Sequence, residues 1–465
     1  MLLGLVAPLA ACAVGPNFHA PAVPTVATYT PHQDGPGGPR LISGEKVDAQ
    51  WWHVFGSADL NALVDTALQH NPSLTAAQET LRAAHETMLA QRAQFFPSVS
   101  ASISPTGQRT AGVLASGVSS GASIYTLTTS QLAVSYTPDI FGANRRAVEA
   151  LVAQEQAQRF EYEAARLTII SNVISAAITD ASLRAQIADT QTAVTDADAI
   201  LDSLRKQLGL GQAAEADVAA QETLVAQLKA TLPALEKQRE LNQDLLAALT
   251  GRTPAELDET HFDFASMSLP DDVPLSLPST LVTQRPDVRI AEAQLHAACA
   301  QVGVAEAALW PNFNITAAAG AANLGYGLAL NGNTSFWSWT ATLTQPIFDG
   351  GMLIHQKRAA MDQYRASAAQ YQSTVLSAFQ NMADVLNALR ADGLAYTAAV
   401  DAEQASGKSL KIAKRQLDLG DVSQVVVLNA EQGYVQAHMA EIQAKANRYA
   451  DVAALFQALG GGWQS

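Results

Sequence analysis

One stretch of the chain is too long for a globular core: from residue 143 to residue 206 there is neither proline nor glycine. At about 1.5 Å per residue, a helix over this stretch would reach roughly 95 Å. A single core cannot enclose such a helix, so the sequence predicts an elongated coiled-coil rod. An apolar stripe with steps of three and four residues supports this prediction; it consists of Ile187, Thr190, Val194, Ala197, Leu201, Leu204 and Leu208.

The stripe resumes after a glycine-containing turn at 209–211 and predicts an antiparallel helix pair with knobs-into-holes packing. A second pair is expected later, with one helix from about Met352 to Leu419, a turn at Gly420 and Asp421, and a helix to about Leu459. The resumed stripe of the first pair consists of Val218, Val225, Leu228, Leu232 and Leu235.

The two helix pairs belong to an internal repeat. Residues 70–102 parallel residues 284–316, prolines included, and residues 207–224 parallel residues 416–433. Each half is predicted to run helix, strand, loop, strand, very long helix, turn, long helix.

Four short segments between the helices alternate apolar with small polar side chains. They predict strands near 97–105, 127–137, 311–320 and 335–345. Period two with one apolar face is typical of a half-solvated sheet, or of a barrel with lipid outside and water inside. A soluble hairpin is the alternative. Two features favour lipid: Trp337 and Trp339 at a strand start, where membrane-interface aromatics would lie, and connecting loops in which Arg109 is the only charged residue.

Four strands are too few to close a barrel, since single-chain barrels begin at about eight strands. Open strand edges are not tolerated in hydrocarbon, so strands in a membrane would have to be shared between copies of the chain. Two copies would give a barrel filled by side chains, and three would leave room for a water-filled bore. Barrel geometry alone favours three copies over two only weakly.

The N-terminus has the pattern of a secreted protein. MLLGLVAPLAAC is a short apolar run that ends in small residues, as in a signal peptide. Leu9-Ala10-Ala11-Cys12 resembles a bacterial lipobox. The resemblance implies that residues 1–11 are removed and that Cys12 carries a diacylglycerol with palmitate-type chains; an ordinary signal peptide is the alternative. Ala13 after the cysteine points to the outer membrane. Residues 12–50, rich in proline and glycine, are predicted to be an extended tether.

Composition and motifs argue against other classes of protein. The net charge of −15 argues against a nucleic-acid partner, which would need a basic stripe. The nine histidines are scattered, and no HExxH, GxSxG, P-loop or dinucleotide turn is present, so we expect no enzyme activity, no metal site and no cofactor besides the lipid. Cys299 lies in an alanine-rich helical run and is expected to be a small buried residue. The seven methionines are dispersed and form no thioether cluster of the kind that suits Cu(I).

Several stretches from residue 12 to about residue 460 resemble the TolC-like outer-membrane factors of Gram-negative efflux systems, in particular their lipoprotein (NodT/OprM-like) subgroup. The resemblance implies a mainly α fold with a small β part. Three copies would share a twelve-stranded β-barrel in the outer membrane, continued by a twelve-helix α-barrel in the periplasm. Residues 51–465 would be one efflux domain of two repeats, about 58–250 and 278–460. The matching stretches are CAVGPNFHAPAVP, WWHVFGSADLNALVDTALQHNPSL, YTPDIFG (LDLFG in the family), LPSTLVTQRPDVRIAEAQL (LPxxLLxRRPDIxxAExxL) and QPIFDGG.

The resemblance implies a function as the passive outer-membrane channel of a tripartite efflux pump that exports drugs or other small toxic compounds. The implied partners are two sister copies, outer-membrane lipid, a periplasmic adaptor (membrane fusion) protein and an inner-membrane pump of the RND type. The alternatives are the exit duct of a type I protein-secretion system, a heavy-metal efflux duct, and a coiled-coil scaffold that is not a channel.

The resemblance also assigns roles to the ends of the helix pairs, which in the family close the pore and meet the adaptor. The matching adaptor-binding residues are Leu208, Gly209, Leu210 and Gly211 in the first turn, and Leu417, Leu419 and Gly420 in the second. Ordinary helix C-caps would have the same residues.

A periplasmic gate is expected just past the second turn. Relatives carry aspartates there, in DVLDA or LTLLDA, whereas this chain has Val426 and Asn429 at those positions. We expect an aperture lined by Val425 and Asn429 that is less cation-selective than in relatives; a buried stripe of valines is the alternative. Arg415 is predicted to pair with Asp418 or Asp421 and lock the tip.

Overall fold

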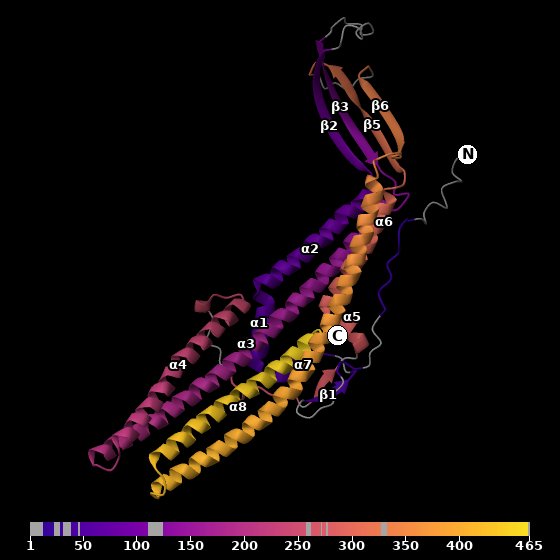
Figure 1. The fold of residues 1–465 in the computed structure, drawn as a ribbon. Helices are drawn as coiled ribbons and strands as arrows, with labels where there is room; N and C mark the ends of the chain where they lie inside the picture. The colour runs from indigo at the N-terminus through magenta and orange to yellow at the C-terminus, as the bar shows by residue number, and fades with distance from the viewer. Residues whose placement is uncertain are drawn as a thin grey trace. The chain divides into compact units, whose positions relative to one another are not determined.

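The computed structural model describes residues 13–22, 28–30, 39–44, 47–109, 124–256, 262–270, 272–275, 278–326 and 333–463. The chain divides into two compact units, and the helices α3 (Ala143–Gly209) and α7 (Met352–Asp418) run through both (Figure 1). The first unit comprises Met1–Pro21, Leu81–Gln158 and Ala291–Tyr371, and the second comprises Ala22–Thr80, Arg159–Ile290 and Gln372–Ser465.

The first unit contains the predicted strands as one antiparallel sheet in the order β2-β3-β5-β6. Its strands are β2 (Ser98–Arg109), β3 (Ile124–Tyr136), β5 (Asn312–Leu324) and β6 (Ser335–Thr344). All four predicted strands are present. β2 and β5 extend four residues beyond their predicted ends (105 to 109 and 320 to 324), because cross-strand pairing carries them past the point where the apolar alternation fades.

The register sorts the side chains of the sheet onto two faces. Val99, Val134, Ala317 and Trp339 form one continuous row across the four strands. The adjacent row on the opposite face consists of Ser98, Ser135, Thr316 and Thr340. One face is therefore apolar and the other carries uncharged hydroxyl groups, as the alternation predicted.

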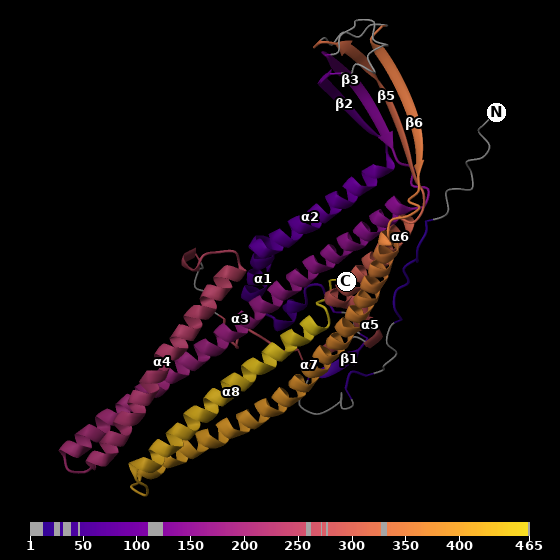
Figure 2. The same cartoon turned by 45° about the horizontal axis from the view of Figure 1, so that its top comes forward.

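The second unit contains two helical hairpins. α3 pairs with α4 (Glu215–Leu249), and α7 pairs with α8 (Gln424–Ala458). The partners of each hairpin lie side by side in both ribbon views (Figures 1 and 2). These bounds agree within a few residues with the predicted helices. The buried seam of the first hairpin contains part of the predicted stripe, namely Ala197, Leu201, Leu204, Val218, Val225 and Leu228, and also Leu224.

The shorter elements of the second unit surround its main core. They are β1 (Arg40–Ser43), η2 (Trp51–Phe55), α1 (Ala58–His70), η5 (Pro254–Glu256), β4 (Asp272–Leu275) and α5 (Pro278–Gln284). Trp51 and Trp52 of η2 lie in this core, where Trp51 stacks on Phe456 with ring centroids 5.0 Å apart. Burial of such aromatic rings contributes strongly to stability.

Two helices, α2 (Pro72–Arg92) and α6 (Pro286–Ala307), begin in the second unit and continue in the first. A short 3-10 turn, η3 (Ala93–Phe95), follows α2. The predicted tether carries one element that the sequence did not indicate. β1 pairs in parallel with β4, and Arg40 forms an ion pair with Asp272 at 2.5 Å. A four-residue strand shows too little periodicity to be found from sequence.

Both repeats contain the same joint, a hydrogen bond from the residue before a helix to the last carbonyl group of a long helix. In the first half, the Asn71 side chain donates to the carbonyl oxygen of Leu249, the last residue of α4, at 2.8 Å. In the second half, Arg285 donates to the carbonyl oxygen of Ala458, the last residue of α8, at 2.9 Å. Each donor directly precedes a helix-starting proline. Each repeat thus fastens the end of its second long helix to the turn before the next helix.

We expect Asn71→Ala to destabilise the second unit by about 1–3 kcal/mol, the cost of a lost helix cap and an unsatisfied buried carbonyl. Asn71 is buried and also accepts hydrogen bonds from the amides of Ser73 and Leu74. Chemical unfolding monitored by circular dichroism measures the change, and Asn61→Ala, a polar substitution on neighbouring α1, is the control. Equal stability of the Asn71 and Asn61 variants would contradict the role of the joint.

Candidate functional site

The turns at the ends of the two hairpins have the same hydrogen-bond pattern. In the first, Gly211 N donates to Leu208 O at 2.9 Å, and Gln212 N donates to Gln207 O at 2.8 Å. The second turn repeats these two bonds from Gly420 to Leu417 and from Asp421 to Gln416, at 3.0 and 2.9 Å. This is the Schellman motif, which needs a left-handed residue at its glycine; φ is +73° at Gly211 and +79° at Gly420.

The turns differ from the prediction in one detail, because Gly209 is the last residue of α3 and has no left-handed φ. The most exposed large apolar side chains of the turns are those of Leu210 and Leu419, which are 74% and 69% exposed. Leu208 is only at the edge of exposure and Leu417 is half-buried. Each tip therefore presents one fully exposed leucine.

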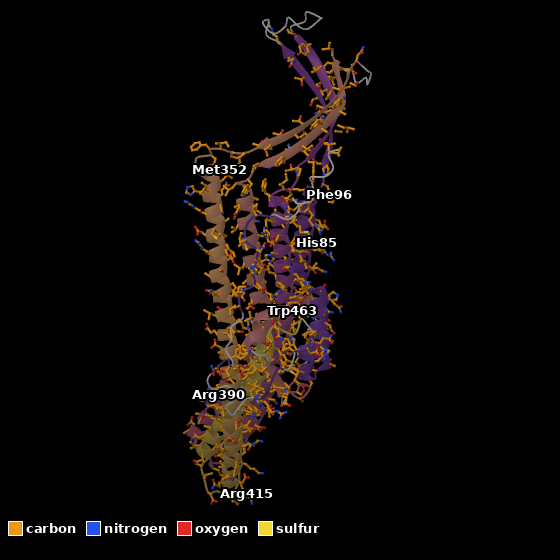
Figure 3. All side chains as sticks on the ribbon, turned by 90° about the vertical axis from the view of Figure 1, so that its right-hand side faces the viewer. His85, Phe96, Met352, Arg390, Arg415 and Trp463 are labelled. Atoms are coloured by element: carbon orange, nitrogen blue, oxygen red, sulfur yellow. The ribbon has the colours of Figure 1, made fainter. Side chains whose placement is uncertain are left out.

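The ion pair predicted at the second tip is not formed within one chain, and a locking role for these residues stays a prediction. Arg415, labelled at the end of the hairpin in Figure 3, forms an ion pair with neither Asp418 nor Asp421, although the structure describes all three. All three side chains are exposed. An exposed pair gains too little from attraction to hold long side chains in one geometry.

The predicted gate residues lie at the start of α8. Val425 and Val426 are exposed, at 44% and 43%, and Asn429 is exposed on the same part of the helix. Val427, between them, is buried. The valines therefore divide between a core position and an exposed surface, so a buried stripe of valines does not describe Val425 and Val426. Their role as a gate stays a prediction.

A polar cluster that the sequence analysis missed lies between α3, α7 and α8. Nε2 of His438 lies 3.0 Å from Oδ2 of Asp189, which joins the second hairpin to the first. Nδ1 of His438 lies 3.9 Å from Oε1 of Glu403, and the ring stacks on Tyr434 at 5.6 Å. Asp189, Tyr434 and His438, together with Lys414, line a cavity of about 120 Å³. The cluster therefore connects the two hairpins by charged groups.

Glu431 is the most buried charged group of this cluster, at 4% exposure. Its Oε1 lies 3.7 Å from Nζ of Lys414, and its Oε2 has no hydrogen-bond partner. Burial raises the pKa of Glu431; Lys414 opposes this shift, and Asp196 adds to it. A lone cation thus compensates a buried carboxylate that has a second carboxylate nearby.

Sequence did carry a signal for this cluster. Asp189 and Asp196 are seven residues apart on α3, and Glu431 and His438 are seven apart on α8, so each pair lies on one helix face. The sequence does not show that these two faces meet, because the packing angle and offset of the hairpins are properties of the fold.

Among the described residues, the two outer strands of the sheet, β2 and β6, each pair on one side and leave the other edge open. Ala322 N donates to Thr334 O at 2.8 Å, which sets the alternation of hydrogen bonds between β5 and β6. Even-numbered residues of β6 therefore bond to β5, and the N–H groups of Trp337, Trp339, Ala341 and Leu343 point away from the sheet. On β2, the same alternation directs Val99, Ala101 and Ile103 outward.

The apolar face of the sheet contains the two predicted interface tryptophans. Trp337 and Trp339 are 76% and 69% exposed and lie level with Ala319 and Ala317. Trp337 lies one row from Ser335, where the face becomes polar, and the apolar face continues past Trp339 to Leu343. A position at the membrane boundary stays a prediction for both.

The predicted lipid attachment residue Cys12 and the signal peptide before it lie outside the described residues. Among the helices that the structure describes, none is long and apolar enough to cross a membrane. No group of His, Cys, Asp and Glu side chains suited to holding a metal occurs in the described ranges. Cys299 is buried, as expected.

The family model for outer membrane efflux proteins matches residues 63–252 and 277–461. The chain belongs to this family. The efflux protein is 30% identical to outer membrane protein OprJ of Pseudomonas aeruginosa, over 98% of this chain and 94% of the relative. It is 29% identical to the toluene efflux pump outer membrane protein TtgC of Pseudomonas putida, over 98% of this chain and 93% of the relative.

The fold of the efflux protein is that of solved outer-membrane channels. It matches the channel OprN with a TM-score of 0.89 at 24% identity, over 98% of this chain and all of that one. The predicted fold class, the outer-membrane location and the function in efflux are therefore confirmed.

Proposed function

We propose that three copies of the efflux protein close a twelve-stranded barrel and form one passive duct across the outer membrane. The observation that carries this proposal is the pair of open edges on β2 and β6. Unpaired backbone groups are costly in hydrocarbon, and β6 of one copy can pair with β2 of the next because their directions alternate around the sheet. Three copies supply twelve strands, enough for a water-filled bore.

The polar face of the sheet supports a duct for small molecules without selection by charge. Many residues of this face carry hydroxyl or amide groups, for example Ser100, Gln131, Thr316 and Ser338, and none of its described residues is charged. The relative TtgC is named for toluene efflux, and we infer that this duct likewise conducts small, mainly organic compounds. It does so without catalysing a reaction.

The hairpin tips are the proposed periplasmic gate and adaptor contact. An exposed leucine at each tip, Leu210 and Leu419, offers an apolar contact for a periplasmic adaptor protein, and through it for an inner-membrane pump of the RND type. The proposed aperture is lined by Val425, Val426 and Asn429. The cluster around His438 and Glu431 holds the second hairpin against α3. A lipid on Cys12 would add an anchor to the barrel.

Purification in detergent followed by planar-bilayer recording tests this function. We expect a trimer that conducts ions with weak selectivity, because neither the polar sheet face nor the proposed aperture carries a fixed charge. A chain that stays a water-soluble monomer without detergent or lipid would contradict the proposal.

The assignment of Asn429 to the aperture can be tested by introducing a carboxylate at this position. Asn429→Asp is expected to shift the channel toward cations by several-fold, since three carboxylates would then meet at one constriction. Asn429→Gln is the matched neutral control. A strong cation preference in the unmodified channel that neither substitution alters would refute the assignment of Asn429.

A further inference from the structure

The first described residues of the chain are bound in the first unit rather than extended into solvent. Val14 N donates to Phe141 O at 3.1 Å, and Ala13 packs directly against Gly142. Phe141 and Gly142 belong to the short connection between the end of β3, at Tyr136, and the start of α3, at Ala143. Ala13 and Val14 therefore lie at the junction of the sheet with the helices.

Arg146, in the first turn of α3, binds the main chain of this segment with its side chain. Its Nε donates to Val14 O at 3.1 Å, and its Nη2 donates to Gly15 O at 3.2 Å and to Oδ1 of Asn17 at 2.8 Å. The side chain is 6% exposed, and its remaining bond goes to Glu149 at 2.7 Å. The segment therefore supplies three of the four acceptors of a guanidinium that is buried when the segment is bound, as a buried charge requires.

α6 forms the other wall of this site. The ring of His296 stacks on Phe18 with centroids 4.4 Å apart, and its Nε2 lies 3.0 Å from Oε1 of Glu149. Burial alone would raise the pKa of Glu149, but its hydrogen bonds to Arg146 and His296 outweigh burial and lower it. Glu149 therefore links the α3 and α6 sides of the site as a carboxylate.

The site leaves no room for side chains where the segment crosses α6. A Cβ on Gly15 would lie 2.5 Å from the Cα of Gly303, and a Cβ on Gly303 would lie 2.8 Å from Cγ of Arg146. His296 and Gly303 are seven residues apart and share one helix face. Gly15 also has a φ of +93°, which strains any residue with a side chain.

We propose that Arg146, Glu149, His296 and Gly303 form a binding site for the chain's own N-terminal segment, an extended peptide recognised mainly through its carbonyl groups. The site fixes the point from which the N-terminus leaves the protein, at the strand–helix junction. If Cys12 is acylated, a step that rests on the proposed function, its lipid enters the membrane beside the sheet. Because α3 and α6 come from different repeats, the bound segment also ties the two repeats together.

A spin label on the segment tests the proposal in the full-length trimer. The label is placed by Ala20→Cys, an exposed position just beyond the site, in a Cys12→Ser background; Cys299 is buried, and the protein without Ala20→Cys controls for its labelling. We expect an immobilised label in this parent. Adding Gly15→Val should make the label mobile and should speed hydrogen exchange of the Val14 amide by about tenfold or more. Gly15 lies outside the folded elements, so this change spares the body of the protein.

His19→Ala is the matched control, because His19 is exposed and next to the site; it should leave the label immobilised. Gly303→Val approaches the same contact from α6 and should release the label as Gly15→Val does. A label that is already mobile in the parent, or that stays immobilised in both valine variants, would overturn the proposal. Mass spectrometry of the unmodified chain reports acylation of Cys12 separately. If Cys12 is not acylated in the unmodified chain, the label in the Cys12→Ser protein is still immobilised. If the segment does not bind at the site, the label is mobile.

Discussion

The double substitution Ala341→Pro/Leu343→Pro is expected to abolish assembly of the barrel while the chain keeps its own sheet. Both residues lie on the edge strand β6, and their N–H groups point away from β5. Proline lacks an N–H and is tolerated on an edge strand whose donors face outward. Each seam between copies would lose two donors, and an unmade hydrogen bond costs about 1–3 kcal/mol when its partner is buried. With three seams, the loss exceeds what a marginally stable assembly tolerates.

Two control variants isolate the backbone donor as the cause. Ala341→Val/Leu343→Val keeps both N–H groups and the apolar character of the face, and should assemble. Thr340→Pro removes a donor that bonds to β5, and should disrupt the sheet of the single chain. Native mass spectrometry in detergent measures the trimer, and bilayer recording measures conductance. A conducting trimer of the Ala341→Pro/Leu343→Pro protein would show that the strands close in another way.

The elements of this fold were predictable because each leaves a local trace in the sequence. The uninterrupted stretch up to Lys206 predicts one helix, and α3 runs from Ala143 to Gly209. Alternation from Val99 to Ile103 predicts a strand and also which of its faces is apolar. The repeat predicts equivalent turns, and Gly211 and Gly420 have the same conformation. Period and chain reversal are set by neighbouring residues, so a single sequence reveals them.

Features that depend on distant contacts were missed. The carboxylate of Glu431 is ordinary in sequence and becomes unusual only because α3 and α7 bury it. β1 exists because β4 pairs with it from more than two hundred residues away. The ion pair predicted for Arg415 failed for a related reason: spacing showed that the groups were near, but not that solvent surrounds them. Burial and the surroundings of a charge are set by the tertiary fold.

The substitution Lys414→Met is expected to loosen the second hairpin from α3 and to increase conductance through the tip. It keeps the aliphatic stem of Lys414 but leaves the carboxylate of Glu431 buried without its cation, 4% exposed and close to Asp196. Removing one partner of a buried pair costs about 3 kcal/mol or more; the lower value applies because Lys414 is itself half exposed. The packed arrangement would then lose about a hundredfold in population relative to one that hydrates Glu431.

Single-channel recording of three variants separates charge from shape. Lys414→Met should show longer or larger open events than the unmodified channel, whereas Lys414→Met/Glu431→Gln should return close to it, because no buried charge remains. Glu431→Gln alone should change little. Equal conductance in Lys414→Met and in the double variant would attribute the effect to lost packing and contradict the electrostatic argument.

The dependence on pH has a definite sign. The raised pKa of Glu431 means that the packed arrangement binds its proton more tightly than a hydrated arrangement does. Packing is therefore favoured as pH falls, and it weakens as pH rises through the raised pKa. Conductance of the Lys414→Met channel should accordingly be higher at about pH 8 than at about pH 5. Asp189, Asp196, Tyr434 and His438 also line this cavity, and Glu403 lies near His438, so the part due to Glu431 is the pH dependence that disappears in Lys414→Met/Glu431→Gln. If both variants respond to pH alike, the charge that holds the hairpins together belongs to another member of the cluster.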